Sequence, residues 1–233
     1  MKANMLFKKY LTYCTHSHGK WDLVFNFDAD FGLNSYNQNL SCQIQLEAAG
    51  VEPVPVIHNI YNDDTDKVTA RGLASHKAVA IGQCTGRTSM RNIRPVVEKL
   101  HGAGAKVHFF GSSEFRLMAQ LPIATCDSTS WCKYPSMGIV LYWNPKKTGF
   151  DKTDKIHFPK LQDAPSPQGS QYYNKYGYLK DFEEYLDNNL GLTTTDLLGN
   201  NADLYRGVVN MLYYCLLEKL ITQHQTVAMG YRF

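Results

Sequence analysis

The stretch IATCDSTSW, residues 123–131, contains the pattern on which the fold depends. An apolar run of strand character stops at the carboxylate of Asp127, small hydroxyl residues follow, and Trp131 comes four residues after the aspartate. A strand end that presents an acid beside an aromatic ring suits chemistry on a flat, ring-shaped substrate. Because Asp and Ser also favour the start of a helix, a helix cap at Asp127 is the alternative interpretation.

Five further segments share this pattern of a short apolar run followed by a polar or glycine-containing corner. They are WDLVFNFDAD (21–30), PVPVIHN (53–59), KAVAIGQ (77–83), KVHFFGSS (106–113) and GIVLYWN (138–144). Nearly continuous apolar character indicates parallel strands buried on both faces. Apolar residues at helical spacing predict helices over 34–50 and 92–104. The alternation of strands and helices predicts an α/β fold.

Polar side chains follow directly after the apolar runs. They are Asp28, Asp30, His58, Gln83, Ser112, Asp127 and Asn144. In a (β/α) barrel the carboxyl ends of all strands open on one face, where the active site lies. No G-x-G-x-x-G or P-loop pattern follows a strand, which disfavours a dinucleotide or ATP site. We therefore predict a TIM-type (β/α) barrel, incomplete because about six strands are recognisable where a closed barrel has eight.

The composition changes after about residue 145. The segment 144–160, NPKKTGFDKTDKIHFPK, interleaves lysines with two phenylalanines, and the Pro-, Gly-, Ser- and Tyr-rich segment 162–178 is predicted to be a loop. Helices are predicted over 181–191 and from Asp203 to about His224. The apolar stripe expected on the last helix is Val208, Leu212, Cys215, Leu216 and Leu220. We predict a barrel domain over 1–160 and a loop and helical C-terminal extension over 161–233.

The composition excludes several classes of protein. Of the 233 residues 44% are hydrophobic and 19% charged, which suits a sizeable core and not wholesale disorder. No window approaches the roughly 20 apolar residues of a membrane span, and the first residues lack a signal-peptide pattern. The six cysteines are scattered without a C-x-x-C pair. We therefore expect a cytoplasmic protein without membrane attachment, metal or cofactor. The net charge of +3 is compatible with a nucleic-acid partner.

Taken in order, the strand ends resemble those of the tRNA-guanine transglycosylase superfamily, most of all its phage-type, DpdA-like branch, which places 7-deazaguanines in DNA. FNFDAD resembles the strand of the base-recognising aspartate, here Asp28, and EAAGVEPVPVIH resembles the segment that ends at His58. VAIGQ resembles a segment written Ile-Gly-Gly in most relatives, so Gly82 matches and Gln83 departs. KVHFFGSS resembles the next strand with its glycine turn, and CDSTSW matches the Asp-Ser-Thr-Ser-Trp motif of the branch. The resemblance covers roughly residues 20–135.

Two features of the family are missing. The tRNA-modifying members hold a structural zinc through three cysteines and a histidine near the C-terminus, and this chain has no such cluster. An earlier strand with an Asp-Ser-Gly motif, whose aspartate assists catalysis, is not found upstream of Trp21. Because an incomplete barrel has two open strand edges, a homodimer or a partner chain that completes the barrel is expected.

The resemblance implies base-exchange glycosyl transfer, in which guanine in DNA, or less readily in tRNA, is replaced by a 7-deazaguanine. Asp127 would form the covalent aspartyl-glycosyl intermediate. Asp28 would accept hydrogen bonds from the base, with Asp30 as a competitor for this role. The alternative function is a catalytically inactive or partner-dependent nucleic-acid-binding homologue.

The remaining candidate residues fall into two groups. For substrate binding they are His58 and Gln83, at the carbonyl edge of the base or the sugar, and Gly82, Gly111 and Ser112, where the backbone could approach the ligand. For nucleic-acid binding they are Trp131, Tyr134, Lys146 and Lys147, because aromatic rings stack on bases and lysines neutralise phosphates. The alternatives are a core histidine at position 58, turn residues at 28, 82 and 111, and a solvated surface for the lysine segment.

Overall fold

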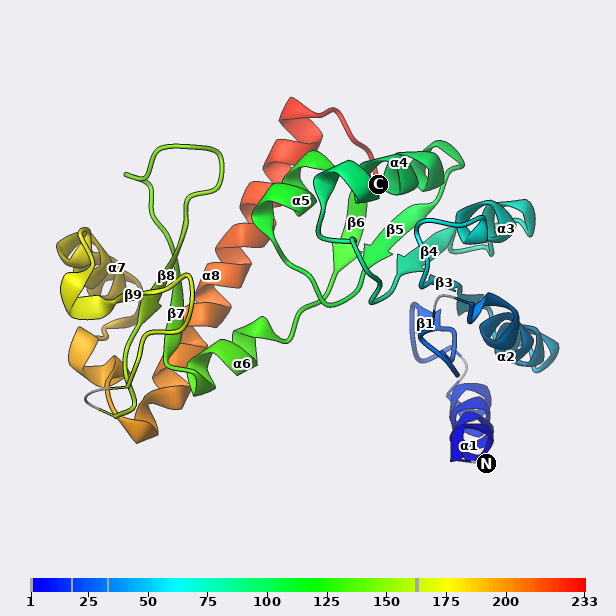
Figure 1. Cartoon of the computed structure of the whole chain (residues 1–233), viewed down its shortest axis with the longest axis horizontal. Helices are drawn as coiled ribbons and strands as arrows, with labels where there is room; N and C mark the ends of the chain where they lie inside the picture. Colours follow the sequence, from blue (N-terminus) through cyan, green and yellow to red (C-terminus); the bar gives the residue numbers. More distant parts are fainter. Residues whose placement is uncertain (1, 18, 33, 162–163) are drawn as a thin grey trace. The chain divides into compact units, whose positions relative to one another are not determined.

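The computed structural model describes residues 2–17, 19–32, 34–161 and 164–233 (Figure 1). The chain divides into two compact units. The first comprises residues 1–127 with 230–233, and the second comprises residues 128–229. Each unit is described by itself below.

The first unit alternates short strands with helices. Its strands are β1 (Val24–Phe25), β2 (Pro53–Val54), β3 (Val56–Ile57), β4 (Ala78–Ile81), β5 (Lys106–Phe109) and β6 (Ile123–Cys126). Its helices are α1 (Lys2–His16), α2 (Tyr36–Ala48), α3 (Asp64–Ala70), α4 (Met90–Gly102) and α5 (Phe115–Gln120). All strand pairs in these two sheets are parallel. The predicted α/β class and the predicted helices over 34–50 and 92–104 are confirmed.

The strands follow one another in space in the order of the sequence. The sheets β1-β2 and β3-β4-β5-β6 adjoin because β2 and β3 are pieces of one extended segment, interrupted at Pro55. The Pro55 carbonyl accepts the Ala80 N–H at 2.9 Å. Crossovers between parallel strands are right-handed, so a sequential order places the intervening helices on one face of the sheet. A doubly wound sheet, by contrast, reverses its strand order.

Three aromatic rings lie together on the sheet face that carries Ala78 and Ala80. The ring centroids of Phe25, His108 and Phe110 are 4.5–4.7 Å apart in all three pairs. Phe25 and Phe110 pack against a buried cluster that contains both alanines. Large rings over small side chains therefore bury this face within the first unit.

Helix α1 covers the outer edge of β1. The Tyr10 hydroxyl donates to the Phe25 carbonyl at 2.5 Å, while the next residue, Asn26, donates its N–H to Val54 of β2 at 2.8 Å. Backbone groups of successive strand residues point to opposite sides, so the Phe25 carbonyl points away from β2. The edge expected to be open at the start of the barrel is thus occupied by α1.

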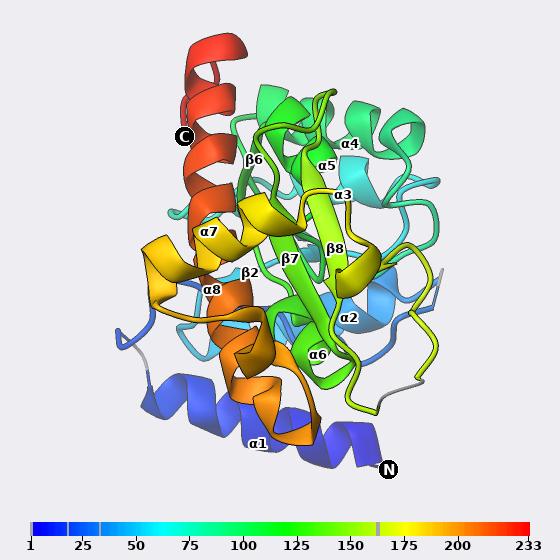
Figure 2. The ribbon, with the colours of Figure 1, turned by 90° about the vertical axis from the view of Figure 1, so that its left-hand side faces the viewer.

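The second unit is built around a three-stranded sheet of order β7-β8-β9. The strands are β7 (Ile139–Trp143), β8 (Thr153–His157) and β9 (Gln171–Tyr172). The α-helices are α6 (Ser130–Ser136), α7 (Leu179–Leu190) and α8 (Asp203–Gln223). Short 3-10 segments cover Tyr173–Lys175, Thr194–Leu197 and Asn200–Ala202, and a π-helical turn covers His224–Ala228. Figure 2 shows α7 lying across β7 and β8.

Strand β7 is confirmed, but its predicted parallel direction is wrong. β7 runs antiparallel to β8, with Ile139 opposite His157 and Trp143 opposite Thr153. The lysine-rich segment 144–160 therefore contains the turn and the second strand, β8, of a hairpin. The continuous apolar run of β7 reflects burial, because Val140 and Tyr142 pack with Phe182 of α7. Burial on both faces does not specify strand direction.

The boundary between the units also differs from the predicted one. Residues 138–160 were assigned to the barrel domain, but β7 and β8 pack with α7 and α8, so the second unit begins at Ser128. The last four residues return to the first unit. There the rings of Tyr231 and Phe233 lie 5.7 and 6.4 Å from the His101 ring of α4.

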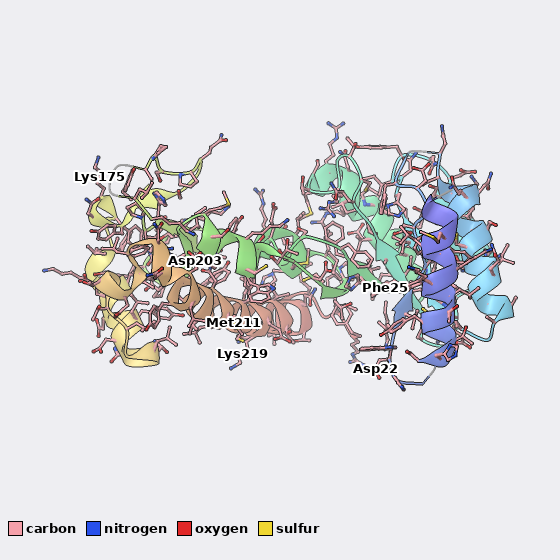
Figure 3. All side chains as sticks on the ribbon, turned by 90° about the horizontal axis from the view of Figure 1, so that it is seen from below. Asp22, Phe25, Lys175, Asp203, Met211 and Lys219 are labelled. Atoms are coloured by element: carbon pink, nitrogen blue, oxygen red, sulfur yellow. The ribbon has the colours of Figure 1, made fainter. Side chains whose placement is uncertain are left out.

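The buried stripe of α8 differs from the predicted apolar stripe. The buried residues are Arg206, Val209, Asn210, Tyr213 and Leu217. Val208 is 38% exposed and Cys215 is also exposed, so the predicted stripe is wrong. Arg206 and Asn210 of this helix face inward because backbone groups supply their hydrogen-bond partners. Figure 3 shows the side chains along α8, with Asp203, Met211 and Lys219 labelled.

Candidate functional site

A cavity of about 560 Å³ lies at the carboxyl ends of the strands in the first unit. Its lining residues are Phe31, Gly32, His58, Gln83, Cys84 and Thr85. They come from the segments that follow β1, β3 and β4. These segments meet because parallel strands present their carboxyl ends at the same edge. The volume is in the range of small-molecule sites.

Asp28 and His58 form an ion-pair contact beside this cavity. The distance from His58 Nε2 to Asp28 Oδ2 is 3.0 Å, and His58 is only 4% exposed. Burial alone would lower the pKa of His58, but the Asp28 carboxylate outweighs it and the pKa is raised. The other carboxylate oxygen, Asp28 Oδ1, is buried and has no hydrogen-bond partner among the described residues. The described part of the protein thus leaves this acceptor unsatisfied.

Asp30 has a local structural task instead. Its Oδ1 accepts the Gly32 N–H at 3.0 Å, and its backbone N–H and carbonyl both bond the Asn39 side chain, at 3.2 and 2.8 Å. Both carboxylates therefore contact a residue of the cavity, Asp28 through the His58 ring and Asp30 through the Gly32 N–H, but only Asp28 keeps a buried oxygen without a hydrogen-bond partner among the described residues.

Gly82 provides the space in which His58 lies. A Cβ atom at position 82 would be 2.5 Å from Cε1 and 2.7 Å from Nδ1 of the His58 ring. Only glycine lets the imidazole lie this close to β4. The neighbouring Gln83 is exposed and lines the cavity.

Phe31 is a cavity residue that the sequence analysis missed. Its ring is 66% exposed and lies 5.3 Å from the His58 ring in an edge-on arrangement. An exposed ring at the wall of a cavity can stack on a flat ligand. The available signal was its position directly after the strand end that carries Asp28 and Asp30.

Asp127 and Gly111 form a second group at the ends of β5 and β6. Asp127 Oδ1 accepts the Gly111 N–H at 2.5 Å, and Gly111 adopts a positive φ of 62°. Helix α6 begins after Thr129, so the helix-cap alternative for Asp127 is not what the structure shows. The carboxylate is exposed and fixed to the neighbouring strand end.

Arg87 connects this group to the cavity loop. It follows Cys84 and Thr85, and its guanidinium donates to the carbonyls of Phe110 and Gly111. The arginine thereby fixes the turn whose N–H holds Asp127. The sequence analysis did not select Arg87, and its place shortly after Gln83 was the only signal.

His108 lies near Asp127 and was also missed. It is buried, its Nδ1 lies 2.9 Å from Thr125 Oγ1, and its Nε2 has no hydrogen-bond partner in the described part of the chain. Burial lowers the pKa of His108, against the opposing effect of the Asp127 carboxylate. The available signal was one polar residue inside the apolar run KVHFF.

The structure thus brings the predicted substrate residues to one strand edge in two groups. His58 and Gln83 line the cavity and Asp28 pairs with His58. Gly111 and Asp127 bond each other. Ser112 is buried.

The predicted nucleic-acid residues belong to the second unit. Trp131 is exposed, and the Lys155 ammonium lies 5.3 Å from the centre of the Tyr134 ring. The ammonium of Lys146 lies 2.5 Å from Asp181, and that of Lys147 lies 2.8 Å from Asp154. The alternative of a locally compensated surface therefore has direct support, and phosphate binding by these lysines stays a prediction.

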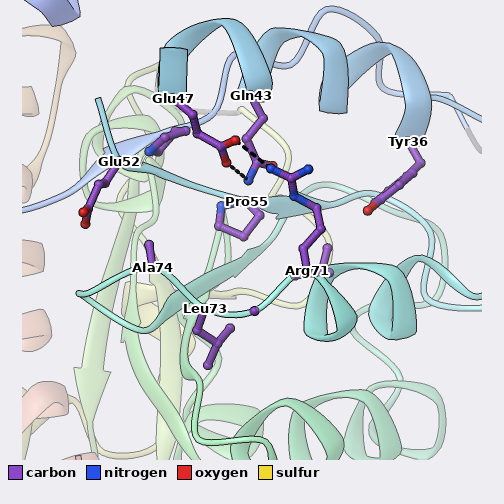
Figure 4. A pocket seen from close by; sticks show the side chains of 11 residues that line it. Tyr36, Gln43, Glu47, Glu52, Pro55, Arg71, Leu73 and Ala74 are labelled. Atoms are coloured by element: carbon purple, nitrogen blue, oxygen red, sulfur yellow. Dashed lines mark hydrogen bonds and ion pairs between the residues drawn. The ribbon is translucent and has the colours of Figure 1, made fainter. Parts of the chain in front are cut away.

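A second cavity, of about 260 Å³, lies between α2 and the segment that follows α3 (Figure 4). Glu47 dominates its polar lining, with Arg71 at 2.6 Å and Gln43 at 2.9 Å. Glu52 and Leu73 of its lining precede β2 and β4. Because the amino ends of parallel strands are associated with stability and Glu47 is already partnered, we do not regard this cavity as the functional site.

Two kinds of feature are absent from the described residues. No group of three or more His, Cys, Asp or Glu side chains in them could hold a metal ion. None of the helices they form has the length and apolar character that crossing a membrane requires.

The fold and the site define the first unit as a parallel α/β unit with polar groups gathered at its strand ends. Comparison of the chain with protein-family models, with curated proteins and with solved structures gives no significant match.

Proposed function

We propose that the first unit is an incomplete (β/α) barrel of the guanine transglycosylase type, and that it exchanges a guanine in DNA, or in tRNA, for a 7-deazaguanine. The observation that carries the proposal is that Asp28 and Asp127 both follow parallel strands of the first unit at their carboxyl ends, Asp28 after β1 and Asp127 after β6. One carboxylate keeps a free acceptor beside a base-sized cavity, and the other is exposed and held by a backbone N–H.

The sequential strand order and the parallel pairing support the barrel assignment. Five parallel segments would form an arc of the barrel, and α1 takes the place of the strand before β1. A second chain, if one completes the barrel, would then add its strands at β6, which ends the sheet order.

In the first step a carboxylate oxygen of Asp127 attacks C1′ of the nucleotide. The bond from C1′ to the guanine nitrogen breaks, its electron pair stays with the base, and guanine leaves after taking a proton from solvent. In the second step the ring nitrogen of the 7-deazaguanine attacks C1′, loses its proton and releases the carboxylate. Two displacements at one carbon preserve its configuration.

Asp28 recognises the base in this proposal. Its free Oδ1 accepts N–H groups of a guanine-like ring, and a base without these donors would leave the buried oxygen unpaired. His58 positions the carboxylate through the 3.0 Å contact, and Phe31 stacks on the ring. Because a base inside a duplex is out of reach, the target nucleotide has to be flipped or single-stranded.

Incorporation of labelled guanine or 7-deazaguanine into DNA and tRNA tests the proposal. We expect Asp127→Asn to lower incorporation about 10³-fold or more, because the nucleophile is lost. Asp30→Asn is the matched control and should retain activity, since Asp30 bonds its own loop. Equal incorporation by Asp127→Asn and the unsubstituted protein would refute the proposal.

The second candidate function is a catalytically inactive homologue that binds nucleic acid, alone or with a partner. It is favoured by α1, which occupies the outer edge of β1, where a preceding strand of the barrel would pair. Under this alternative the unsubstituted protein binds DNA and incorporates no labelled base.

A further inference from the structure

Helix α1 has one apolar face and one basic face. The apolar face, with Phe7 and Cys14 buried, packs against residues of α2 and of the segment around β1. The opposite face carries Met5, Lys8, Lys9, Thr12, Tyr13 and His16, all exposed. We call these six residues the basic face of α1. Because the apolar face is already buried, what α1 offers to a partner is positive charge with an exposed tyrosine.

The positive charge of this segment is not compensated locally. Residues 1–21 contain four lysines and no aspartate or glutamate. Lys8 and Lys9 form no ion pair within the described part of the chain. A free pair of lysines one helical step apart can neutralise neighbouring phosphates.

The other Lys-Lys pair of the chain has the opposite character. Lys146 and Lys147 each contact an aspartate, at 2.5 and 2.8 Å. A phosphate that binds there has to compete with Asp181 and Asp154, whereas at Lys8 and Lys9 it replaces only water and counterions.

Packing places α1 next to the candidate site. The rings of Phe7 and Tyr10 lie 5.4 and 5.6 Å from the Phe27 ring, and Asp28 is the next residue. The pKa of Tyr10 is raised, mainly by burial, and the nearby Asp28 carboxylate adds to the effect. Helix α1 thus adjoins the segment that carries Asp28, and a polyanion on the opposite, basic face would lie about one helix diameter, roughly 10 Å, from that segment.

We propose that the basic face of α1 binds the phosphate backbone of a single-stranded nucleic acid whose unpaired base enters the cavity beside Asp28. This inference rests on the proposed function for the identity of the ligand. A membrane surface fits the basic face less well, because insertion needs a broad exposed apolar face; Phe7 and Cys14 are buried, and only Met5 and Leu6 among the described aliphatic side chains of α1 are exposed. The exposed Tyr13 ring suits stacking on an unpaired base.

The test measures the affinity of the full chain for a fluorescent single-stranded DNA oligonucleotide at several salt concentrations between about 50 and 200 mM. The variants are Lys8→Ala/Lys9→Ala and Lys146→Ala/Lys147→Ala, which remove the same charge from two places. We expect the first to weaken binding several-fold and to reduce the slope of log K against log salt by about 0.7 for each lysine removed. The second should leave the slope unchanged.

Single substitutions provide a matched control. Lys106 is exposed at the first residue of β5, at the amino end of the sheet and away from the cavity. Lys9→Ala should weaken binding and Lys106→Ala should not. Equal losses would mean that only net charge matters, and a larger loss in Lys146→Ala/Lys147→Ala would place the phosphates on the second unit. Either result overturns the proposal, as does selective loss of binding to anionic phospholipid vesicles. Circular dichroism verifies that all variants fold.

The test of nucleic-acid binding by the basic face can succeed or fail independently of the test of base exchange. Oligonucleotide binding and exchange of labelled base are measured separately, on the unsubstituted protein and on Lys8→Ala/Lys9→Ala. If binding depends on Lys8 and Lys9 while no base is exchanged, the basic face stands and the enzymatic proposal fails. If base exchange occurs but binding does not depend on Lys8 and Lys9, the enzymatic proposal stands and the proposal for the basic face fails. A parallel titration with tRNA distinguishes the two nucleic acids.

Discussion

The two units treat their buried polar groups differently. In the second unit Arg206 is fully buried, and its guanidinium donates to the carbonyls of Leu197 and Gly199 at 2.8 and 2.7 Å and to Asp203 at 2.8 Å. In the first unit Asp28 Oδ1 and His108 Nε2 are buried without a hydrogen-bond partner among the described residues. Among the described residues, every buried side-chain nitrogen or oxygen without a hydrogen-bond partner belongs to the first unit, except His157 Nδ1, which belongs to the second.

The difference separates structural polar groups from candidate functional ones. A buried polar atom without a partner costs about 1–3 kcal/mol, so it persists where something other than stability requires it. Among these residues, Asp28 contacts His58 of the cavity lining, and His108 lies close enough to Asp127 to feel its charge. A ligand that satisfies them would recover the cost on binding.

Removal of the buried arginine should have the largest effect on stability. Arg206→Met leaves the Leu197 and Gly199 carbonyls without their donor, and we expect the free energy of unfolding to fall by about 3–5 kcal/mol. Urea denaturation followed by circular dichroism measures the change. Lys219→Met, at an exposed position on the same helix (Figure 3), should stay within about 0.5 kcal/mol. A small loss for Arg206→Met would mean that the satisfied network is not structural.

Arg206 also shows why part of the fold escaped prediction. The apolar runs predicted the strands, because a nearly continuous hydrophobic segment has few other uses. The stripe on α8 was predicted from hydrophobicity alone, but the helix faces inward with Arg206 and Asn210. Asn210 bonds the backbone of Ile139 and Leu141, far away in the sequence, and Arg206 bonds carbonyls of the segment just before the helix. No hydrophobic pattern announces either set of partners.

The candidate site was predictable to the extent that it depends on strand ends. Asp28, His58 and Asp127 each follow an apolar run, and parallel pairing does bring them to one edge. Phe31 and Arg87 come from the loops beyond, whose course depends on tertiary contacts. Helix α1 was not predicted. It packs on the edge of β1 through the Tyr10 hydroxyl, and this is a tertiary contact that the local sequence does not show.

The second prediction concerns the bond between α8 and β7. Asn210 Oδ1 accepts the Leu141 N–H at 2.8 Å, and its Nδ2 donates to the Ile139 carbonyl at 3.1 Å. Asn210→Leu keeps the size but leaves both backbone groups unpaired, so we expect a loss of about 2–3 kcal/mol. Met211→Leu at the exposed neighbouring position should be neutral. If both variants unfold at the same urea concentration as the unsubstituted protein, the buried amide has no structural role.

The third prediction tests how closely the His58 ring packs against Gly82. Gly82→Ala places a methyl group 2.5 Å from the His58 ring, which has to move, and we expect a loss of about 1–2 kcal/mol together with weaker ligand binding. Gly102→Ala is the matched control, because nothing lies within 4 Å of the added carbon. It should be neutral or slightly stabilising. Thermal denaturation of both variants measures the contrast, and equal melting temperatures would contradict the close seating of His58.

The smallest effect on stability is expected for Asp28→Asn, and it should depend on pH. Asp28 raises the pKa of His58 above its unfolded value, so the pair stabilises the fold fully below about pH 6.5 and this contribution disappears as the pH rises through the raised pKa. In Asp28→Asn burial acts on His58 without its carboxylate, although Asp64 still favours the charged ring. The melting temperatures of the two proteins should therefore differ most near pH 5.5 and converge near pH 8.5. The corresponding difference in the free energy of unfolding is about 1 kcal/mol or less. In a His58→Gln background Asp28→Asn should show no such pH dependence. A difference that is constant with pH would mean that the 3.0 Å contact does not couple the two groups, and that Asp28 is held in place by other parts of the strand edge.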